Sequence, residues 1–294
     1  MNQKAIKGAG VGLRIPHIQH VLKNKPRVPW FEVHICNFLS APLNRQLLLE
    51  ISKDYPISFH GVSLNLGGTA PLNPVYLSSL KQAVDEFQPA LVSEHACFTS
   101  LNEQYFHDLL PIPYTSQAVG HFADRIDQVQ DTLGRPILIE NISKYFEYAE
   151  STLTEAEFLA ALCSRTGCKL VLDINNIYVN QFNFPENKDL LLEHYLQSIP
   201  YQHIGEIHLA GHSQCEGQLI DTHSCPVSDD VWNLFTSFIH QWEIKAKDKT
   251  PPPCLIEWDS QLPEFSVLEQ EQTKAESLMR TYRASSRKSF EATM

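Results

Sequence analysis

The 294-residue sequence predicts an α/β protein with a single (β/α)8 TIM barrel. Two observations favour this fold. Short runs rich in β-branched and aromatic residues alternate eight times with longer stretches whose apolar residues recur every three to four positions. These units lie within residues 8–262, and about 250 residues is the usual size of such a barrel. No G-x-G-x-x-G follows the first run, so an open dinucleotide-binding sheet loses its main support.

Each predicted strand is a short apolar run bounded by polar or turn-forming residues. In chain order the eight strands cover residues 8–14, 30–35, 57–64, 91–98, 137–143, 169–179, 204–211 and 254–259. Strands that alternate with helices form parallel sheets, and eight of them favour closure into a barrel.

Each predicted helix carries its apolar residues on one face. The helices cover residues 44–54, 73–87, 115–134, 154–167, 187–199 and 228–247, and a helical tail follows Val267. Gly134 suits the end of the third helix, and Pro136 follows it. The fourth begins at Thr154, which forms a capping box with Glu157 three residues later.

The domain organisation is predicted to be simple. No Gly/Ser-rich linker and no change in composition marks a boundary, so we expect one domain over residues 1–294. Its barrel core covers about 8–262, and residues 263–294 form the C-terminal helical tail.

Composition narrows the classes of function. The formal net charge of −11 and the pI of about 5.6 argue against a nucleic-acid partner, which favours a basic face. The N-terminus lacks the apolar stretch of a secretory signal, and no run approaches a membrane span. Seven cysteines without a CxxC pair are typical of reduced thiols, so we expect a cytoplasmic protein without membrane insertion.

Residues that bind metals stand at the ends of the predicted strands. Six strands carry one within them or at the C-terminal end: His60; Glu94 and His95; Glu140; Asp173; His208; and Glu257. A parallel barrel strand is buried on both faces, so charged groups there are costly unless they are paired or bind a metal. The C-terminal ends of barrel strands also form the active face, which would bring these side chains together.

Each of these residues also has a structural explanation when it is taken alone. His60 suits a hydrogen-bonded core histidine, Glu140 or Glu257 half of a buried ion pair, and Asp173 a helix cap. Taken together these explanations fail, because each strand would need its own separate reason for a metal-binding residue at the same position. The pattern therefore predicts a multinuclear metal site.

The donor atoms indicate the class of metal. Imidazole and carboxylate without a thiolate pair suit zinc, manganese or iron. A carboxylate such as Glu140 is able to bridge two ions, which sit about 3.5–4 Å apart in two-metal sites. Asp221 and His223, two residues apart in the loop after residues 204–211, add two further donors.

The ordered donor series resembles the xylose-isomerase-like barrels, which include endonuclease IV, a trinuclear zinc enzyme. Longer strings resemble the multinuclear non-haem iron-dependent oxidative enzymes, the family of the methanobactin-maturing oxidase. These strings include "WFEVH", "FHGVSLNLGG", "LVSEHACF", "ILIENISKYF", "GCKLVLDINNIYVN", "EIHLAGH" and "LIDTHSCPV". The resemblance extends from about residue 8 to residue 260.

This resemblance implies three metal positions. The first takes His60, His95 and Glu140. The second takes Glu140, Asp173, His208 and Glu257, and the third takes Asp221 and His223 with Asn176 nearby. Endonuclease IV has a histidine where this chain has Asn176, and an amide oxygen is the weaker ligand. Residues in matching strings would line the pocket or orient the ligands: Arg14, Glu32, His34, Asn65, Glu94, Asn141, Asn175, His212 and Asp259.

The resemblance implies an oxidoreductase that uses O2 and two to three iron ions (Fe2+/Fe3+) to modify cysteine in a ribosomally made precursor peptide. It also implies a separate substrate-presenting partner protein. Two alternatives remain open at this stage. The same ligands would serve a zinc- or manganese-dependent phosphodiesterase or sugar isomerase, and the chain would also suit a metal-handling protein without turnover.

Overall fold

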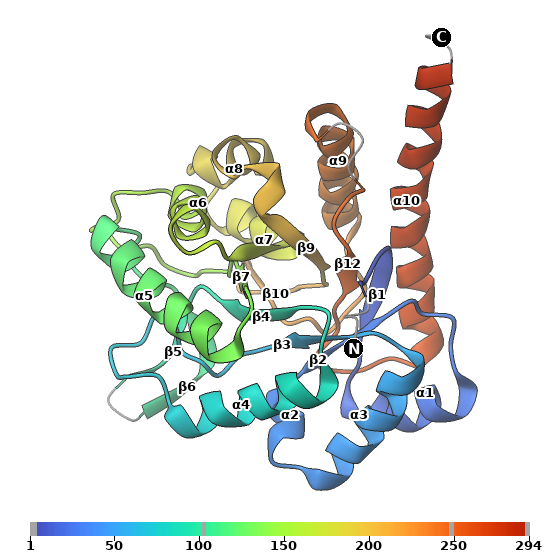
Figure 1. The fold of residues 1–294 in the computed structure, drawn as a ribbon. Helices are drawn as coiled ribbons and strands as arrows, with labels where there is room; N and C mark the ends of the chain where they lie inside the picture. Colours follow the sequence, from blue (N-terminus) through green and yellow to red (C-terminus); the bar gives the residue numbers. More distant parts are fainter. Residues whose placement is uncertain (1–4, 102–103, 247–249, 292–294) are drawn as a thin grey trace.

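A computed structural model of the protein describes residues 5–101, 104–246 and 250–291. Eight parallel strands close into a barrel, which confirms the predicted fold (Figure 1). They are β1 (Ala9–Gly12), β2 (Phe31–His34), β3 (Ile57–His60), β4 (Val92–His95), β7 (Leu138–Glu140), β8 (Lys169–Asp173), β9 (Ile204–Leu209) and β12 (Cys254–Ile256). Neighbours in the barrel follow chain order, and β12 closes the ring against β1.

Helices surround the barrel and cover its outer apolar face (Figure 1). They are α1 (Ile18–Asn24), α2 (Cys36–Leu39), α3 (Pro42–Asp54), α4 (Pro74–Phe87), α5 (Ser116–Leu133), α6 (Glu155–Thr166), α7 (Ile174–Asn183), α8 (Leu192–Ser198), α9 (Asp229–Lys245) and α10 (Phe265–Glu291). Three 3₁₀ turns lie between them, at Ile15–His17, Lys188–Leu190 and Tyr201–His203. The capping box of Thr154 and Glu157 forms as predicted at the start of α6.

Two hairpins leave the barrel at the C-terminal ends of its strands. The first pairs β5 (Phe98–Leu101) with β6 (Gln104–Leu110), and the second pairs β10 (Ser213–Cys215) with β11 (Gln218–Ile220). In the second, Glu216 and Gly217 both have positive φ, as tight two-residue turns require. Neither hairpin was predicted from the sequence, where both merge with the strands and loops around them.

One strand prediction is wrong in its second half. Residues 169–179 were predicted as one strand, but β8 ends at Asp173 and α7 begins at Ile174. The Asp173 side chain accepts a hydrogen bond from the backbone of Asn176 and so starts the helix. Residue 247, the end of another predicted helix, lies outside the described residues.

The first part of the C-terminal tail packs against the barrel beside β1 (Figure 1). Gln272 Nε2 donates to the carbonyl of Ala9 at 2.8 Å, and Glu276 Oε2 accepts from the Ala9 amide at 2.8 Å. Phe265 and Leu268 of the same helix are buried. No helix in the described chain is both long and apolar enough to cross a membrane.

Candidate metal centre

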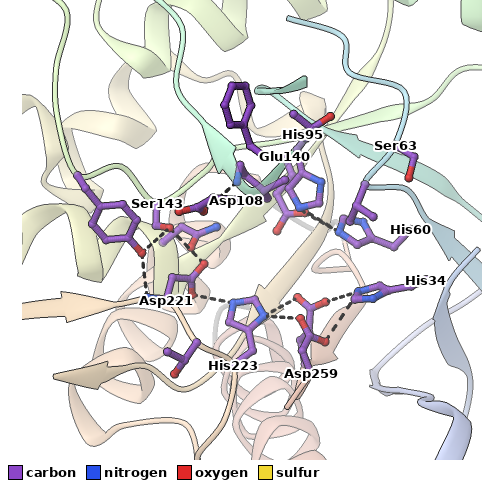
Figure 2. A pocket seen from close by; sticks show the side chains of 18 of the residues that line it. His34, His60, Ser63, His95, Asp108, Glu140, Ser143, Asp221, His223 and Asp259 are labelled. Atoms are coloured by element: carbon purple, nitrogen blue, oxygen red, sulfur yellow. Dashed lines mark hydrogen bonds and ion pairs between the residues drawn. The ribbon is translucent and has the colours of Figure 1, made fainter. Parts of the chain in front are cut away.

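The predicted donors gather at the C-terminal end of the barrel (Figure 2). His60, His95, Glu140 and Asp173 are each the last residue of a strand, and Glu257 directly follows β12. Because the strands are parallel, their last residues meet at one rim, and period-two alternation points these side chains inward.

His60, His95 and Glu140 form a compact trio. The Nε2 atoms of the two histidines lie 3.2 Å apart, and they lie 3.2 and 3.3 Å from Glu140 Oε2. Metal–nitrogen bonds of about 2.0–2.1 Å place the ligands of one ion roughly 3–3.4 Å apart. The trio therefore has the spacing of donors to a single ion.

The Nδ1 atom of each histidine, which faces away from the trio, has a hydrogen-bond partner that sets the orientation of the ring. His95 Nδ1 lies 3.0 Å from the carbonyl of Gly61, which makes it the protonated nitrogen. His60 Nδ1 lies 2.7 Å from Ser93 Oγ. Such contacts orient metal-binding histidines and leave the Nε2 lone pairs for the ion.

A second group shares Glu140. His208 Nδ1 lies 3.1 Å from Glu140 Oε1 and 3.2 Å from Glu257 Oε2. Asp173 completes this set, whose donor atoms all lie within 4.8 Å of one another. Glu140 thus directs one oxygen at each group, which is the arrangement of a bridging carboxylate.

Several buried atoms of these groups that could bind a metal make no hydrogen bond within the described chain. They include Glu140 Oε2, Asp173 Oδ2 and both ring nitrogens of His208. Buried polar atoms without partners are rare because each loses its hydration without compensation. Cations bound in the two groups would satisfy Glu140 Oε2, Asp173 Oδ2 and His208 Nδ1, whereas His208 Nε2 faces Glu32 on the other side of its ring. The donor set therefore fits a metal centre.

Two more carboxylates, those of Glu32 and Glu206, lie inside the barrel on the other side of the His208 ring. His208 Nε2 lies 3.4 Å from Glu32 Oε1 and 4.0 Å from Glu206 Oε1, and all three residues are fully buried. Glu206 was missed at the level of the sequence. Its position two residues before His208 was the available signal, since alternate strand residues share a face.

The residues of the third predicted position line the same cavity as His60, His95 and Glu140. Asp221 Oδ1 lies 2.7 Å from His223 Nε2, and the amide oxygen of Asn176 is buried without a hydrogen bond among the residues described. On the other side of the His223 ring, a compact donor group joins its Nδ1 atom to Glu257 and Asp259. His223 has a φ of 44°, a costly conformation for a residue with a side chain, and one that is concentrated at functional sites.

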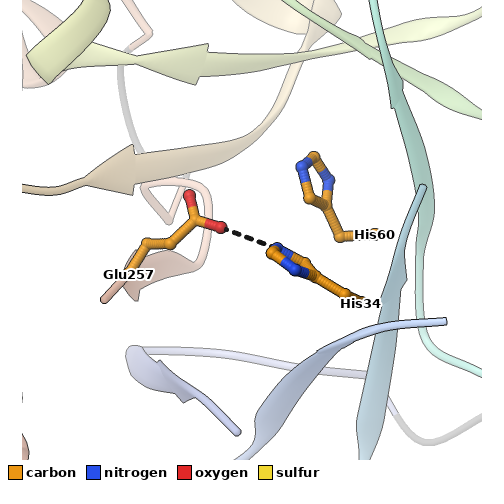
Figure 3. Close-up of side chains that lie close together, drawn as sticks. All are labelled: His34, His60 and Glu257. Carbon is orange, nitrogen blue, oxygen red and sulfur yellow. Dashed lines mark hydrogen bonds and ion pairs between the residues drawn. The ribbon is translucent and has the colours of Figure 1, made fainter. Parts of the chain in front are cut away.

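His34 is a further donor, which the sequence had placed only in the pocket lining. Its Nε2 lies 3.3 Å from Glu257 Oε1, and it forms a compact group with His60 and Glu257 (Figure 3). Arg14 is buried beside them, donates to Glu257 Oε1 at 3.0 Å and also pairs with Asp259. The Arg14 guanidinium therefore holds both carboxylates in place.

Residues expected to orient the ligands do contact them. Asn141 Oδ1 accepts from the amide of Asp173 at 2.8 Å. Asn175 Nδ2 donates to Asp221 Oδ1 at 2.6 Å, and His212 Nδ1 lies 2.8 Å from Asn175 Oδ1.

Glu94 and Asn65 hold the surrounding loops. Glu94 Oε1 accepts from the amides of Ser63 and Leu64. Glu94 Oε2 accepts from the amide of His95 at 3.0 Å and lies 3.8 Å from the Nδ1 atom of its ring. Asn65 bonds the start of the β5–β6 hairpin.

One cavity of about 450 Å³ is lined by His60, His95, Glu140, His223 and Glu257, but not by Asp173 or His208 (Figure 2). Five carboxylates line it, and its described lining contains no lysine or arginine. The β5–β6 hairpin contributes Tyr105, Phe106 and Asp108 to the wall. The cavity is therefore an acidic chamber that opens beside the hairpin.

Without a cation the centre retains protons. Burial raises the pKa of Asp173 well above its usual range, and it raises that of Glu32 to about 7. Burial lowers the pKa of His95, but nearby carboxylates, Glu140 first, outweigh this effect and raise it to about 9. The protons occupy the positions that a cation would neutralise.

Metal affinity should therefore rise with pH. His95, with a pKa of about 9, is protonated at pH 7 and must lose its proton before Nε2 is able to bind an ion. Each displaced proton lowers the apparent affinity about tenfold per pH unit below that pKa. Competition titrations with Zn2+ between pH 6 and 9 measure this dependence, and an affinity that does not change with pH would contradict the assignment of His95.

Comparison with known proteins agrees with this architecture. The family described as RiPP precursor modification enzyme MbnB/TglH/ChrH matches residues 8–280. A UPF0276 protein of Acaryochloris marina is 44% identical over 279 residues, which cover 95% of this chain and 97% of that protein. A UPF0276 protein of Chromobacterium violaceum is 42% identical and covers 92% and 94% of the two chains.

Solved structures share the barrel at low sequence identity. Endonuclease IV of Thermus thermophilus superposes with a TM-score of 0.57 at 14% identity, over 95% of this chain and 99% of that one. D-psicose 3-epimerase of Clostridium cellulolyticum gives 0.57 at 9% identity, with the same coverage. These likenesses establish the xylose-isomerase-like fold. Together with the family match over nearly the whole chain, they confirm the resemblance seen in the sequence, and the chain belongs to the MbnB/TglH/ChrH family of RiPP precursor modification enzymes.

Proposed function

We propose that this protein is a multinuclear iron-dependent oxidase that uses O2 to modify cysteine in a ribosomally made precursor peptide. It acts in the cytoplasm with a separate partner protein that presents the peptide. The family description supports a peptide substrate. The observation that carries the metal assignment is Glu140, whose two oxygens face two separate sets of buried donors.

The proposed ligands follow from the contacts. His60, His95 and Glu140 hold one ion, and Glu140, Asp173, His208 and Glu257 hold a second. A third would lie at His223 Nε2 with Asp221 and Asn176, while Glu257 and Asp259 face Nδ1 on the other side of the His223 ring. Iron bound there would supply redox chemistry, accepting the cysteine sulfur as a ligand and passing electrons from it to O2.

The residues of the chain itself prepare the site for this chemistry. The Ser93 hydroxyl and the Gly61 carbonyl hold the imidazoles of His60 and His95, and Arg14 holds Glu257. The trio of His60, His95 and Glu140 offers three donors, so an ion held there would have open positions for exogenous ligands. Tyr105 and Phe106 add aromatic surface to the cavity wall that an incoming peptide would meet.

Metal content and turnover test the proposal together. Protein from iron-supplemented cells, purified without chelator, is expected to contain two to three iron ions per chain and little zinc. It should oxidise a cysteine-containing peptide encoded beside its gene, with a mass change that requires O2. If the protein keeps zinc despite the iron supply and consumes no O2, the same ligands would instead support a zinc-dependent hydrolase or isomerase. Binding of metal without any turnover would indicate a metal-handling protein.

A further inference from the structure

The layer of inward-facing residues below the metal centre follows the type of ligand above it. Side chains two positions apart on a strand point to the same side, so the residue two positions before each candidate ligand also faces the barrel interior. Before His34, His60, His95 and His208 this residue is polar: Glu32, Ser58, Ser93 and Glu206. Before Glu140, Asp173 and Glu257 it is apolar: Leu138, Val171 and Leu255. Both kinds are buried, so solvent does not account for the polar ones.

The chemistry of the ligands accounts for this pattern. A neutral imidazole that binds an ion through one nitrogen carries a proton on the other, and in the dry interior this proton needs an acceptor. A carboxylate ligand has no such proton. The Nδ1 atom of His60 lies 2.7 Å from Ser93 Oγ, whose own hydroxyl donates to the carbonyl of Phe59 at 3.3 Å. Ser93 Oγ is therefore the acceptor for the proton of the His60 ring.

His208 has two carboxylates at the corresponding place. Its Nδ1 atom faces the second set of donors, 3.1 Å from Glu140 Oε1 and 3.2 Å from Glu257 Oε2. An ion bound to Nδ1 leaves the ring proton on Nε2, which lies 3.4 Å from Glu32 Oε1 and 4.0 Å from Glu206 Oε1. Nε2 makes no hydrogen bond within the described residues, so these two oxygens are the acceptors that face this proton.

The surroundings of the two carboxylates leave them available to His208. Glu32 Oε2 accepts from Ser58 Oγ at 3.0 Å, which anchors the side chain with Oε1 toward His208. Neither oxygen of Glu206 has a hydrogen bond in the described chain. Among the described residues, His208 is the one basic side chain within 4.0 Å of either carboxylate. Both glutamates are fully buried, and a buried carboxylate is costly unless it has a partner.

We propose that Glu32 and Glu206 are positioning residues of the metal centre. Together they accept the proton on His208 Nε2 and so keep Nδ1 as the nitrogen that binds the ion of the second set. A carboxylate acceptor behind the ring also raises the basicity of the nitrogen that binds the ion. This inference rests on the proposed metal centre, but it depends neither on the identity of the metal nor on O2 chemistry.

Nitrogen-15 NMR observes the proton itself. The full chain with labelled histidines is stripped of metal with a chelator and reloaded with Zn2+, which is diamagnetic. We expect the His208 ring to carry a proton on Nε2 and none on Nδ1. A ring with its proton on Nδ1, or with no proton, contradicts the proposal. The measurement uses the parent chain, so it does not depend on whether a variant folds.

Competition titrations with Zn2+ measure the effect on affinity. Glu32→Met/Glu206→Met removes both acceptors at similar side-chain size. The ion of the second set should then bind about 10–100-fold more weakly, the usual loss for an outer partner of a ligand. The ion of the first set should keep its affinity, because Ser93 and Gly61 hold its histidines.

Two further variants separate the hydrogen bond from a loss of packing. Glu32→Gln/Glu206→Gln retains an oxygen acceptor on each side chain and should restore most of the affinity. Glu155→Met is the matched control, because it removes a buried glutamate outside the candidate ligands and should leave both affinities unchanged.

Anomalous diffraction at the zinc edge, from crystals with limiting Zn2+, identifies the position that is emptied. Equal affinity in the double methionine variant and the parent chain would overturn the proposal. A zinc peak between Glu32, Glu206 and His208 Nε2 would do so too, because the carboxylates would then be ligands themselves. A parent chain that binds no zinc would contradict the metal centre, whereas equal affinities would leave that centre in place and contradict this inference alone.

Discussion

Replacing Glu140 with glutamine should remove at least one of the bound ions and lower peptide oxidation at least about a hundredfold, more than the loss of an outer partner of a ligand. Glutamine keeps the size of the side chain but exchanges one oxygen for an amide nitrogen, which does not bind a metal. Glu140 Oε2 faces His60 and His95, and Oε1 faces His208. Whichever oxygen is replaced, one set of donors loses its shared ligand.

Elemental analysis and thermal unfolding measure this effect. The matched control is Glu155→Gln, because Glu155 is also buried, accepts a hydrogen bond from Tyr114 Oη at 2.8 Å, and lies outside the candidate ligands. The control variant should retain its full metal content. Full metal content in Glu140→Gln itself would remove the bridging role from Glu140.

The sequence was sufficient to predict the barrel and the end of its strands at which the metal-binding side chains lie. Both depend on short-range patterns. A buried strand appears in the sequence as an apolar run, and its last inward-facing residue follows from the alternation of side chains along the strand. His60, Glu140 and Asp173 were located in this way, and each ends its strand in the structure. Glu206 was within reach of the same count, but it lies inside its strand rather than at the end.

The missed features depend on contacts between distant segments. The stretch after Asp173 is rich in β-branched and aromatic residues, and the capping bond of Asp173 nevertheless makes it helical. The grouping of His223 with Asp259 depends on a loop whose backbone has a positive φ at His223. No local pattern encodes that conformation. The attachment of the β5–β6 hairpin likewise depends on Asn65, which lies more than thirty positions earlier in the chain.

Substitution of Asp173 should separate its role as a ligand from its role as a helix cap. Its Oδ1 accepts the amide of Asn176 at 2.6 Å, while Oδ2 is buried and has no hydrogen bond within the described residues. Asparagine retains the capping oxygen and removes the charge, whereas alanine removes both. We therefore expect Asp173→Asn and Asp173→Ala to lose the same ion, and the alanine variant alone to lose about 1 kcal/mol or more of stability.

The effect of Asp173→Asn on stability is best measured in the metal-free chain. Burial raises the pKa of Asp173 well above its usual range, so the metal-free side chain favours its neutral form more than an exposed carboxyl does. Asparagine is nearly isosteric with that neutral form, and the metal-free Asp173→Asn variant should unfold close to the parent chain. Denaturant unfolding after chelation, beside elemental analysis before it, gives both quantities. If Asp173 only caps α7, the asparagine variant will retain every ion, and the second set of donors will be reduced to Glu140, His208 and Glu257.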